Sequence, residues 1–161
     1  MKEEQYSVRK LTERAEKERF IEACDSAYTI SVVGRSFYPE LLDKIDRKAV
    51  MLGLYGDADE PVGYSAFYAN DPEGRKAFLT LFCVRPEWQR QRLGELLMRE
   101  SCAEAARLGM ETMALEVLEE DEGQIIFYRR QGFEKTGPGK PGFLTLERCL
   151  PAEERGNGGK A

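Results

Sequence analysis

Hydrophobic and polar residues in the middle of the chain form a pattern that predicts three consecutive strands. They cover residues 49–55, 62–69 and 76–84, where β-branched and aromatic residues cluster between turn-forming segments. Short connections of this kind favour an antiparallel meander. Because the third strand is almost continuously apolar over 78–84, we expect it to be central in the sheet and buried on both faces.

The segment before these strands predicts one more strand and two helices. Residues 6–11 alternate as a first strand, and Thr12 can cap a helix over 13–27. An aromatic and β-branched stretch over 28–39 then precedes a short helical pattern over 40–47. These elements add helices to the predicted meander.

The second half of the chain alternates helical and extended patterns. A long helix is predicted over 93–108, followed by a strand over 112–118, a second helix over 124–131 and a last strand over 143–150. A glycine follows each helix, as is common at helix ends. The apolar residues of the long helix predict its inner face, which comprises Leu93, Leu96, Leu97, Ala103 and Ala106.

Strands thus form a run first and alternate with helices later, which is typical of the mixed α/β class with a partly antiparallel sheet. A length of 161 residues suits one compact domain. We therefore predict a single domain over 1–152 and a flexible polar tail over 153–161.

Composition narrows the classes of function. The net charge is −5 and the basic residues are dispersed, which argues against a nucleic-acid partner. No apolar run approaches the ~18 residues that a membrane helix needs, and the N-terminus has no signal-peptide pattern. These features predict a cytoplasmic protein without a membrane partner.

The residues available for catalysis are restricted in type. The chain has no histidine, and its four cysteines do not have metal-ligand spacing, so we predict no metal site and no cysteine–histidine nucleophile pair. Any general base must therefore be Asp, Glu, Tyr, a cysteine, a terminus or water.

A basic loop between the third meander strand and the long helix is the most informative segment. The first amide groups of a helix have no partner within the helix, and together with the helix dipole they form an anion site. Arg90 and Arg92, with Gln89 and Gln91, surround that helix start. The loop therefore predicts a diphosphate site, although a basic helix start facing solvent is the alternative.

At this loop the chain resembles the GNAT superfamily of N-acetyltransferases. Residues 89–94 read QRQRLG and fit the family's Q/R-x-x-G-x-G/A hallmark, with Arg92 at a position where the family usually has glycine. A second match follows in the correct order, because Leu115-Glu116-Val117 precedes residues 125–133, IIFYRRQGF. That pair is similar to the family's L-E-V…A-I-x-F-Y-x-x-x-G-F signature.

The resemblance implies the GNAT fold: a mostly antiparallel twisted sheet of about six or seven strands, splayed between the fourth and fifth strands and flanked by about four helices. It also implies acetyl-CoA (coenzyme A) as cofactor. Asp121 and Gln124 stand where the family often has asparagine and alanine. The residues implied in cofactor binding are Phe82, Cys83 and Val84 through their backbone, then Gln89, Arg90, Gln91, Arg92, Leu93, Gly94, Glu95, Asp121, Gln124, Phe127 and Tyr128.

The resemblance suggests two catalytic residues. Tyr128 would protonate the departing thiolate, and Glu116, on the opposite strand face from Leu115 and Val117, would be the base. The alternatives are a packing tyrosine and a structural or solvated carboxylate. Other members place the base on the preceding strand, at the position of Thr80, which cannot serve as a base.

Aromatic residues supply the candidates for the acceptor pocket. We expect the pocket to form from the segment 28–39 and the loop 137–142, with Tyr28, Phe37, Tyr38 and Tyr68 as its side chains. Surface packing and sheet core are the alternative interpretations of these residues.

Together these features predict an acetyl-CoA-dependent N-acetyltransferase that acts on a primary amine of a small molecule or peptide by direct attack in a ternary complex. The alternative is a catalytically silent acyl-CoA-binding regulatory module. Since members of the family are often dimers, the resemblance also allows a homodimer.

Overall fold

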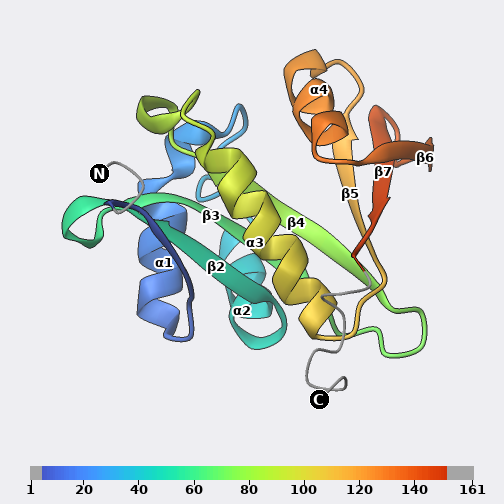
Figure 1. Ribbon diagram of the computed structural model, residues 1–161. Helices are drawn as coiled ribbons and strands as arrows, with labels where there is room; N and C mark the ends of the chain where they lie inside the picture. Colours follow the sequence, from blue (N-terminus) through green and yellow to red (C-terminus); the bar gives the residue numbers. More distant parts are fainter. Residues whose placement is uncertain (1–4, 152–161) are drawn as a thin grey trace. The chain divides into compact units, whose positions relative to one another are not determined.

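The computed structural model describes residues 5–151 and has the predicted α/β class (Figure 1). A seven-stranded sheet follows the hydrogen-bonded order β1-β2-β3-β4-β5-β7-β6. Its β4–β5 pair is parallel, whereas β1–β2, β2–β3, β5–β7 and β6–β7 are antiparallel. The strands are β1 (Ser7–Lys10), β2 (Val50–Tyr55), β3 (Pro61–Tyr68), β4 (Lys76–Val84), β5 (Thr112–Leu118), β6 (Glu134–Pro138) and β7 (Phe143–Cys149).

Four α-helices accompany this sheet within residues 5–151, as the resemblance implied. They are α1 (Arg14–Ala23), α2 (Tyr38–Lys48), α3 (Leu93–Arg107) and α4 (Glu122–Arg130). Short 3₁₀ turns cover η2 (Asp25–Ala27), η3 (Asp57–Asp59) and η4 (Pro86–Trp88). The predicted tail, 153–161, lies outside the described residues.

The chain forms two compact units, which are described separately. The first, unit 1, comprises the described parts of 1–67 and 81–101, and the second, unit 2, those of 68–80 and 102–161. The single domain over 1–152 stays a prediction, as does the splay between β4 and β5.

Unit 1 packs α1 and α2 against apolar side chains of β2 and β3. The Lys17 ammonium is buried and bonds the Asp46 carboxylate at 3.0 Å and the Asp46 carbonyl at 3.1 Å, which ties α1 to α2. The ion pair gives hydrogen-bond partners to the Lys17 ammonium and the Asp46 carboxylate, which packing of the helices removes from water. The core of this unit contains Leu11, Phe20, Ile21, Cys24, Val32, Leu42, Ile45, Met51, Tyr55, Tyr64, Ala66, Leu81 and Cys83.

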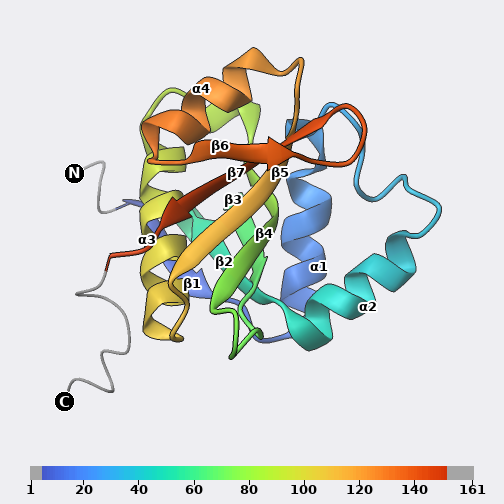
Figure 2. The ribbon, with the colours of Figure 1, turned by 90° about the vertical axis from the view of Figure 1, so that its right-hand side faces the viewer.

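Unit 2 is built on the antiparallel pair of β5 and β7 (Figure 2). Leu115 lies opposite Leu146, and both are buried on the core face. Because side chains alternate along a strand, Glu116 and its partner Thr145 share the opposite face. The register therefore separates the apolar core of this unit from the polar residues of the L-E-V segment.

The helix before η2 differs from its prediction at both ends. Thr12 does not cap it, because Glu13 occupies the N-cap position without a side-chain hydrogen bond. The helix ends at Ala23 and is followed by η2, in which the Ala27 amide donates to the Cys24 carbonyl at 3.0 Å. The Asp25 carboxylate then accepts from the amides of Val32 and Val33 at 2.7 and 3.2 Å. The predicted helix over 13–27 was therefore too long.

The prediction that the third meander strand is buried on both faces was wrong for its first half. Lys76 and Phe78 are exposed while Ala77 and Leu79 are buried, so that half of β4 alternates. Its central place in the strand order is confirmed. An apolar run therefore did not distinguish a strand buried on both faces from one with exposed aromatic and basic side chains.

Several smaller boundaries also moved. The helix predicted over 40–47 begins at Tyr38, because Pro39 is accommodated in a first helical turn, and β6 forms where no separate strand was expected.

The buried face of α3 differs from its prediction. Leu96 and Ala103 are only half-buried on α3, whereas Met98 and Ser101 are buried. The buried Ser101 hydroxyl is 2.7 Å from that of Ser65, which explains how a polar residue is tolerated there.

Two further features of the described residues concern membrane spans and thiols. Within residues 5–151, no helix is both long and apolar enough to cross a membrane. All the cysteines are free thiols, and Cys24, Cys83 and Cys102 are buried while Cys149 is exposed.

The Glu16 carboxylate in unit 1 provides a pH-dependent contribution to stability. The Arg19 guanidinium donates to it at 2.8 and 2.9 Å and the Tyr55 hydroxyl at 2.6 Å. The bonds from Arg19, then that from Tyr55, lower the pKa of Glu16 from 4.5 to about 2. Since the folded state holds the proton less tightly, this stabilisation is complete above pH 4.5 and is lost as the pH falls towards 2.

We expect Glu16→Gln to flatten the acid limb of the stability profile between pH 4.5 and 2, because the glutamine cannot gain a proton. Urea denaturation at a series of pH values measures this slope. Glu13→Gln, at an exposed glutamate just before the same helix, is the control and should keep the wild-type slope. Equal slopes in all three proteins would contradict the assignment.

Candidate functional site

The loop between β4 and α3, in unit 1, is anchored at its base by Arg85. The Arg85 amide donates to the Val62 carbonyl at 2.8 Å, and its guanidinium donates to the Glu60 carboxylate at 3.1 Å and the Pro61 carbonyl at 3.0 Å. The guanidinium carbon also lies 5.1 Å from the centre of the Trp88 ring. These contacts fix the start of the loop, a role of Arg85 that no pattern in the sequence predicted.

Two glutamines of the predicted cofactor set make contacts within unit 1. The Gln89 side-chain amide donates to the Val84 carbonyl at 2.8 Å, so it closes the end of β4. The Gln91 side-chain oxygen accepts a hydrogen bond from the Tyr6 hydroxyl at 3.4 Å. Both side chains are exposed, and Gln89 is a brace of the loop in addition to its predicted role.

The loop turns through two arginines in the left-handed backbone region. The φ angle is +69° at Arg90 and +65° at Arg92, a conformation that costs a residue with a side chain roughly 1–2 kcal/mol. The family's usual glycine adopts such angles without strain, which explains that preference at position 92. In this chain the turn places two exposed guanidinium groups beside the helix start.

The start of α3 has the features of an anion site. The Leu96 amide donates to the Arg92 carbonyl at 3.1 Å, so the amides of Leu93, Gly94 and Glu95 form the helix's first, unpaired turn. The Arg92 side chain is 88% exposed and 3.8 Å from the Glu95 carboxylate, a distance at which an exposed ion pair contributes little. Its charge is therefore available to an incoming anion.

The end of β4 shows which of its backbone groups are already paired. Phe82 is half-buried, and Cys83 and Val84 are buried. The Val84 carbonyl accepts a hydrogen bond from the Gln89 side chain. Burial, and then a hydrogen bond with Cys24, raises the pKa of the Cys83 thiol well above its usual range. The backbone role of these residues stays a prediction, and the Cys83 thiol itself is unsuited to act as a nucleophile.

In unit 2, the C-terminal end of α4 fixes Tyr128. The Phe133 amide donates to the Tyr128 carbonyl at 3.1 Å and the Gly132 amide to the Arg129 carbonyl at 3.0 Å, with φ +97° at Gly132. This is a Schellman motif, in which the left-handed position favours glycine and the next residue packs back on the helix. The Phe133 ring accordingly lies 5.8 Å from the Tyr128 ring.

The Gly132–Phe133 pair of the family signature thus has a structural role, because it ends α4 and packs against Tyr128. Tyr128 is buried, and the half-buried Phe127 ring lies 5.3 Å from its ring. The aromatic contacts of Phe127 and Phe133 restrict the ring to one orientation.

The N-terminal end of α4 contains the two departures from the family pattern. The Asp121 carboxylate accepts from the Gln124 amide at 3.1 Å and caps the helix, while the Gln124 side chain is exposed. A capping requirement explains Asp121, because aspartate and asparagine serve equally well at this position.

Glu116 projects from β5 on the same face as Thr145 and is half-buried. Its carboxylate makes no hydrogen bond or ion pair with any residue between 5 and 151. One of its carboxylate oxygens lies 3.2 Å from the position that a Cβ would take at Gly139, in the predicted acceptor loop. An unpaired, half-buried carboxylate can accept a proton from a bound group.

The aromatic candidates for the acceptor pocket are distributed over both units. In unit 1, the Tyr28 hydroxyl donates to that of Tyr64 at 3.2 Å, and burial raises the pKa of both phenols well above the usual value. Phe37 is 55% exposed, and in unit 2 Tyr68 is half-buried. The Tyr28 hydroxyl is thus committed to its neighbour, while the Phe37 ring is accessible.

Tyr38 is half-buried and packs against the core of unit 1. Its hydroxyl is a buried oxygen without a hydrogen-bond partner among the described residues. Burial, with Glu18 and Glu22 nearby, raises the pKa of Tyr38 to about 12. The phenol is therefore neutral at physiological pH and can only donate or accept a hydrogen bond.

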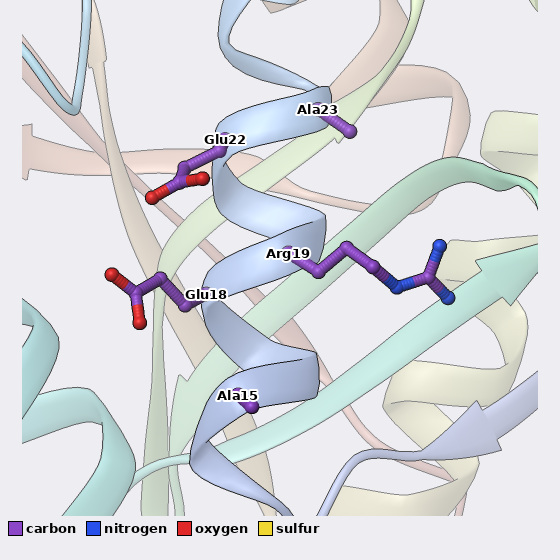
Figure 3. Close-up of a pocket in the computed structure, with 5 residues that line it drawn as sticks. All are labelled: Ala15, Glu18, Arg19, Glu22 and Ala23. Carbon is purple, nitrogen blue, oxygen red and sulfur yellow. The ribbon is translucent and has the colours of Figure 1, made fainter.

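A hollow of about 570 Å³ lies along the outer side of α1 in unit 1 (Figure 3). Glu18 and Glu22 point to one side of the helix, and Arg19 points to the other side, where Ala23 also lies. None of the residues predicted for the site lines this hollow.

Comparison with known proteins identifies the family. The model of the "Acetyltransferase (GNAT) family" matches residues 8–133, which is more than half of the chain. The chain belongs to the GNAT family of acetyltransferases. GNAT acetyltransferases use acetyl-CoA, so the predicted cofactor is confirmed at the level of the family. A search of the curated proteins finds no match.

Solved structures confirm the GNAT fold. The PaiA N-acetyltransferase from Thermoplasma acidophilum, in complex with coenzyme A, has a TM-score of 0.76 at 20% identity, over 89% of this chain and 98% of that one. The ribosomal-protein-S18-alanine N-acetyltransferase from Escherichia coli has a TM-score of 0.73 at 18% identity, over 90% and 94%. A GNAT acetyltransferase from Elizabethkingia anophelis with acetyl-CoA bound has a TM-score of 0.66 at 16% identity, over 91% and 99%.

The left-handed turn of this GNAT chain leads to a prediction about stability. We expect Arg92→Gly to be more stable than Arg92→Ala by about 1 kcal/mol, because both lose the charge and only glycine relaxes the positive φ. Urea denaturation measures the difference.

Arg99, an exposed residue in the middle of α3, provides the matched control. There the order should reverse, with Arg99→Gly less stable than Arg99→Ala by about 1 kcal/mol, since glycine weakens a helix interior. The same order at both positions would show that residue 92 is not held in the left-handed region.

Proposed function

We propose that this GNAT acetyltransferase transfers an acetyl group from acetyl-CoA to a primary amine of a small molecule or peptide. The reaction would be a direct attack in a ternary complex. The observation that carries the proposal is the start of α3, where unpaired helix amides meet two exposed arginines in the family's hallmark position. Acetyl transfer follows from the family, whereas the amine acceptor belongs to the proposal.

The donor set at this loop fits the diphosphate of coenzyme A. The amides of Leu93, Gly94 and Glu95 supply neutral donors, and Arg90 and Arg92 supply positive charge on exposed side chains. Gln91 adds a further polar group, while Gln89 and Arg85 hold the loop in shape. These residues would bind and orient the cofactor without taking part in proton transfer.

Further cofactor contacts are proposed from the family pattern. The backbone of Phe82, Cys83 and Val84 would bind the pantetheine amides as an added strand does, with the Val84 carbonyl shared with Gln89. Asp121, Gln124 and Phe127 at α4 would complete the set. Once bound, the cofactor supplies the acetyl group as an activated thioester.

Two residues of unit 2 would handle the protons. A free amine has a pKa near 10 and is mostly charged at neutral pH, so it must lose a proton before it can attack. The Glu116 carboxylate, which has no partner among the described residues, would accept that proton directly or through water. The Tyr128 hydroxyl would give its proton to the departing sulfur.

The class of acceptor is proposed from the aromatic residues and from the names of similar proteins. Tyr28, Phe37, Tyr38 and Tyr68 would line the acceptor side, with Phe37 as the exposed ring. Similar structures include acetyltransferases named for a ribosomal-protein alanine and for nourseothricin. Protein and small-molecule amines therefore both belong in an acceptor screen. A homodimer and a cytoplasmic location complete the proposal.

The second candidate is a catalytically silent acyl-CoA-binding module. It is favoured by Thr80 at a position where other members carry their base, and by the strained Arg92 in place of glycine. The enzyme is supported instead by Tyr128 in the frame of the family signature and by the Glu116 carboxylate, which has no partner within residues 5–151. Release of free thiol from acetyl-CoA with a panel of amines distinguishes the two, because a silent module would bind the cofactor without turnover.

We expect Tyr128→Phe to lower turnover about 100-fold or more, the usual contribution of a general acid, with acetyl-CoA binding changed less than about twofold. The phenylalanine keeps the aromatic contact with Phe133, so folding should be preserved. Thiol release and calorimetry measure the two effects. An unchanged rate would remove Tyr128 from the proposed mechanism.

We expect Arg90→Ala combined with Arg92→Ala to weaken coenzyme A binding by about tenfold or more, which corresponds to about 1.4 kcal/mol. Binding of pantetheine, which lacks the phosphates, should change little. The control, Lys48→Ala with Arg99→Ala, removes two exposed positive charges elsewhere in unit 1 and should leave both affinities intact. Equal weakening of coenzyme A and pantetheine would refute the diphosphate assignment.

A further inference from the structure

The loop between β6 and β7 is held by a dense set of backbone hydrogen bonds. The Gly139 amide donates to the Phe143 carbonyl at 2.9 Å, and the Phe143 amide donates to the Lys140 carbonyl at 2.9 Å. The Glu119 amide donates to the Gly142 carbonyl at 2.9 Å, which attaches the loop to the end of β5. These bonds give the loop a defined conformation in unit 2.

Glycine at position 139 is not required by the backbone angles. Gly142, in the same loop, has a φ of +85°, whereas Gly139 does not lie in the left-handed region. An alanine at 139 would therefore be free of the strain that it would meet at 142. The reason for glycine here must lie in what surrounds its α-carbon.

The Glu116 carboxylate occupies the space where a side chain would begin. A Cβ at position 139 would lie 3.2 Å from the Glu116 Oε2, 3.2 Å from the Phe143 Cβ and 3.3 Å from its carbonyl carbon. Such distances are tighter than ordinary van der Waals contacts, so a neighbour must move. The carboxylate is the more mobile neighbour, because Phe143 is fixed by its backbone bonds to the loop.

The β5–β7 ladder gives Glu116 a neighbour on its own face of the sheet. Thr145 is the direct cross-strand partner of Glu116, so their side chains are neighbours on one face. The Thr145 hydroxyl donates to the Pro138 carbonyl at 3.3 Å, so its proton is directed to the loop. Thr145 therefore does not hold the carboxylate by a hydrogen bond, whereas a side chain at position 139 would press on it.

We propose that Gly139 is a positioning residue, whose missing side chain lets the Glu116 carboxylate lie against the loop backbone in the place where it meets the acceptor amine. The inference rests on the proposed function, in which Glu116 takes the proton of that amine. It adds a size limit at a position outside the two signature motifs. A methyl group at 139 displaces the carboxylate by a few tenths of an ångström, enough to disturb a proton transfer that depends on distance.

The test compares Gly139→Ala with Gly137→Ala, because a Cβ at position 137 meets no atom within 4 Å and Gly137 also has no positive φ. The amine used is the most active of a panel containing a polyamine, an amino sugar, free amino acids and an alanine-terminated peptide. We expect Gly139→Ala to lower kcat/KM for that amine about tenfold or more. Acetyl-CoA affinity by calorimetry should stay within about twofold of wild type in both variants. Thr136→Ala, at an exposed residue of β6 outside the predicted acceptor loop, is the activity control and should keep kcat/KM within about twofold.

A double-mutant cycle separates positioning from general damage to the loop. In a Glu116→Gln background, which keeps the size of the side chain but cannot take up the proton, we expect Gly139→Ala to change the rate less than about twofold. The same tenfold loss in that background would overturn the proposal, because the effect would then come through Phe143.

The ¹³C carboxyl resonance of Glu116 gives a readout that does not depend on turnover. We expect it to shift in Gly139→Ala and to stay in place in Gly137→Ala. An unmoved resonance in Gly139→Ala overturns the inference even if no amine is acetylated. If wild type acetylates the amine and Gly139→Ala does so equally well, the positioning role fails while the proposed function stands.

Discussion

The turn between β4 and α3 is the constraint on which the anion site depends. A strand that ends inside the sheet must reverse into a helix within a few residues, and here two arginines in left-handed conformations make that reversal. The strain is offset locally, because Arg85 and Gln89 tie the loop to the backbone of β3 and β4. The first amides of α3 and the guanidinium groups then concentrate donors and positive charge at one place. Without that turn the hallmark residues would be ordinary polar residues on a loop.

The second signature also reduces to backbone geometry. Asp121 closes one end of α4 and the Gly132–Phe133 pair closes the other, so the nine-residue helix is capped at both ends. A helix this short depends on its caps and on packing, since few intrahelical bonds support it. The aromatic contacts that terminate it are the same ones that orient Tyr128. Fold stability and placement of the candidate acid therefore have a common cause in this unit.

The sequence predicted those features that depend on local patterns. Gly132 predicted the end of α4, and the QRQRLG segment predicted a loop before α3, because both follow from short-range hydrogen bonding. Burial of the third meander strand was overestimated, since exposure of Lys76 and Phe78 depends on what covers that face. Thr12 as a cap failed because the choice between two adjacent polar residues depends on the angle at which the chain enters the helix. The approach of Gly139 to Glu116 joins residues on β5 and on the β6–β7 loop, and a single sequence carries no signal for such a contact.

The distribution of thiols has a practical consequence for work in solution. Three of the four cysteines are inside the packed units, and Cys149, the last residue of β7, is exposed. A maleimide dye added to the folded protein would therefore attach at one defined position in unit 2. The same sulfur reacts with the disulfide reagents that detect free coenzyme A, so each protein molecule adds one thiol equivalent to the background signal. Replacing Cys149 with serine removes that background.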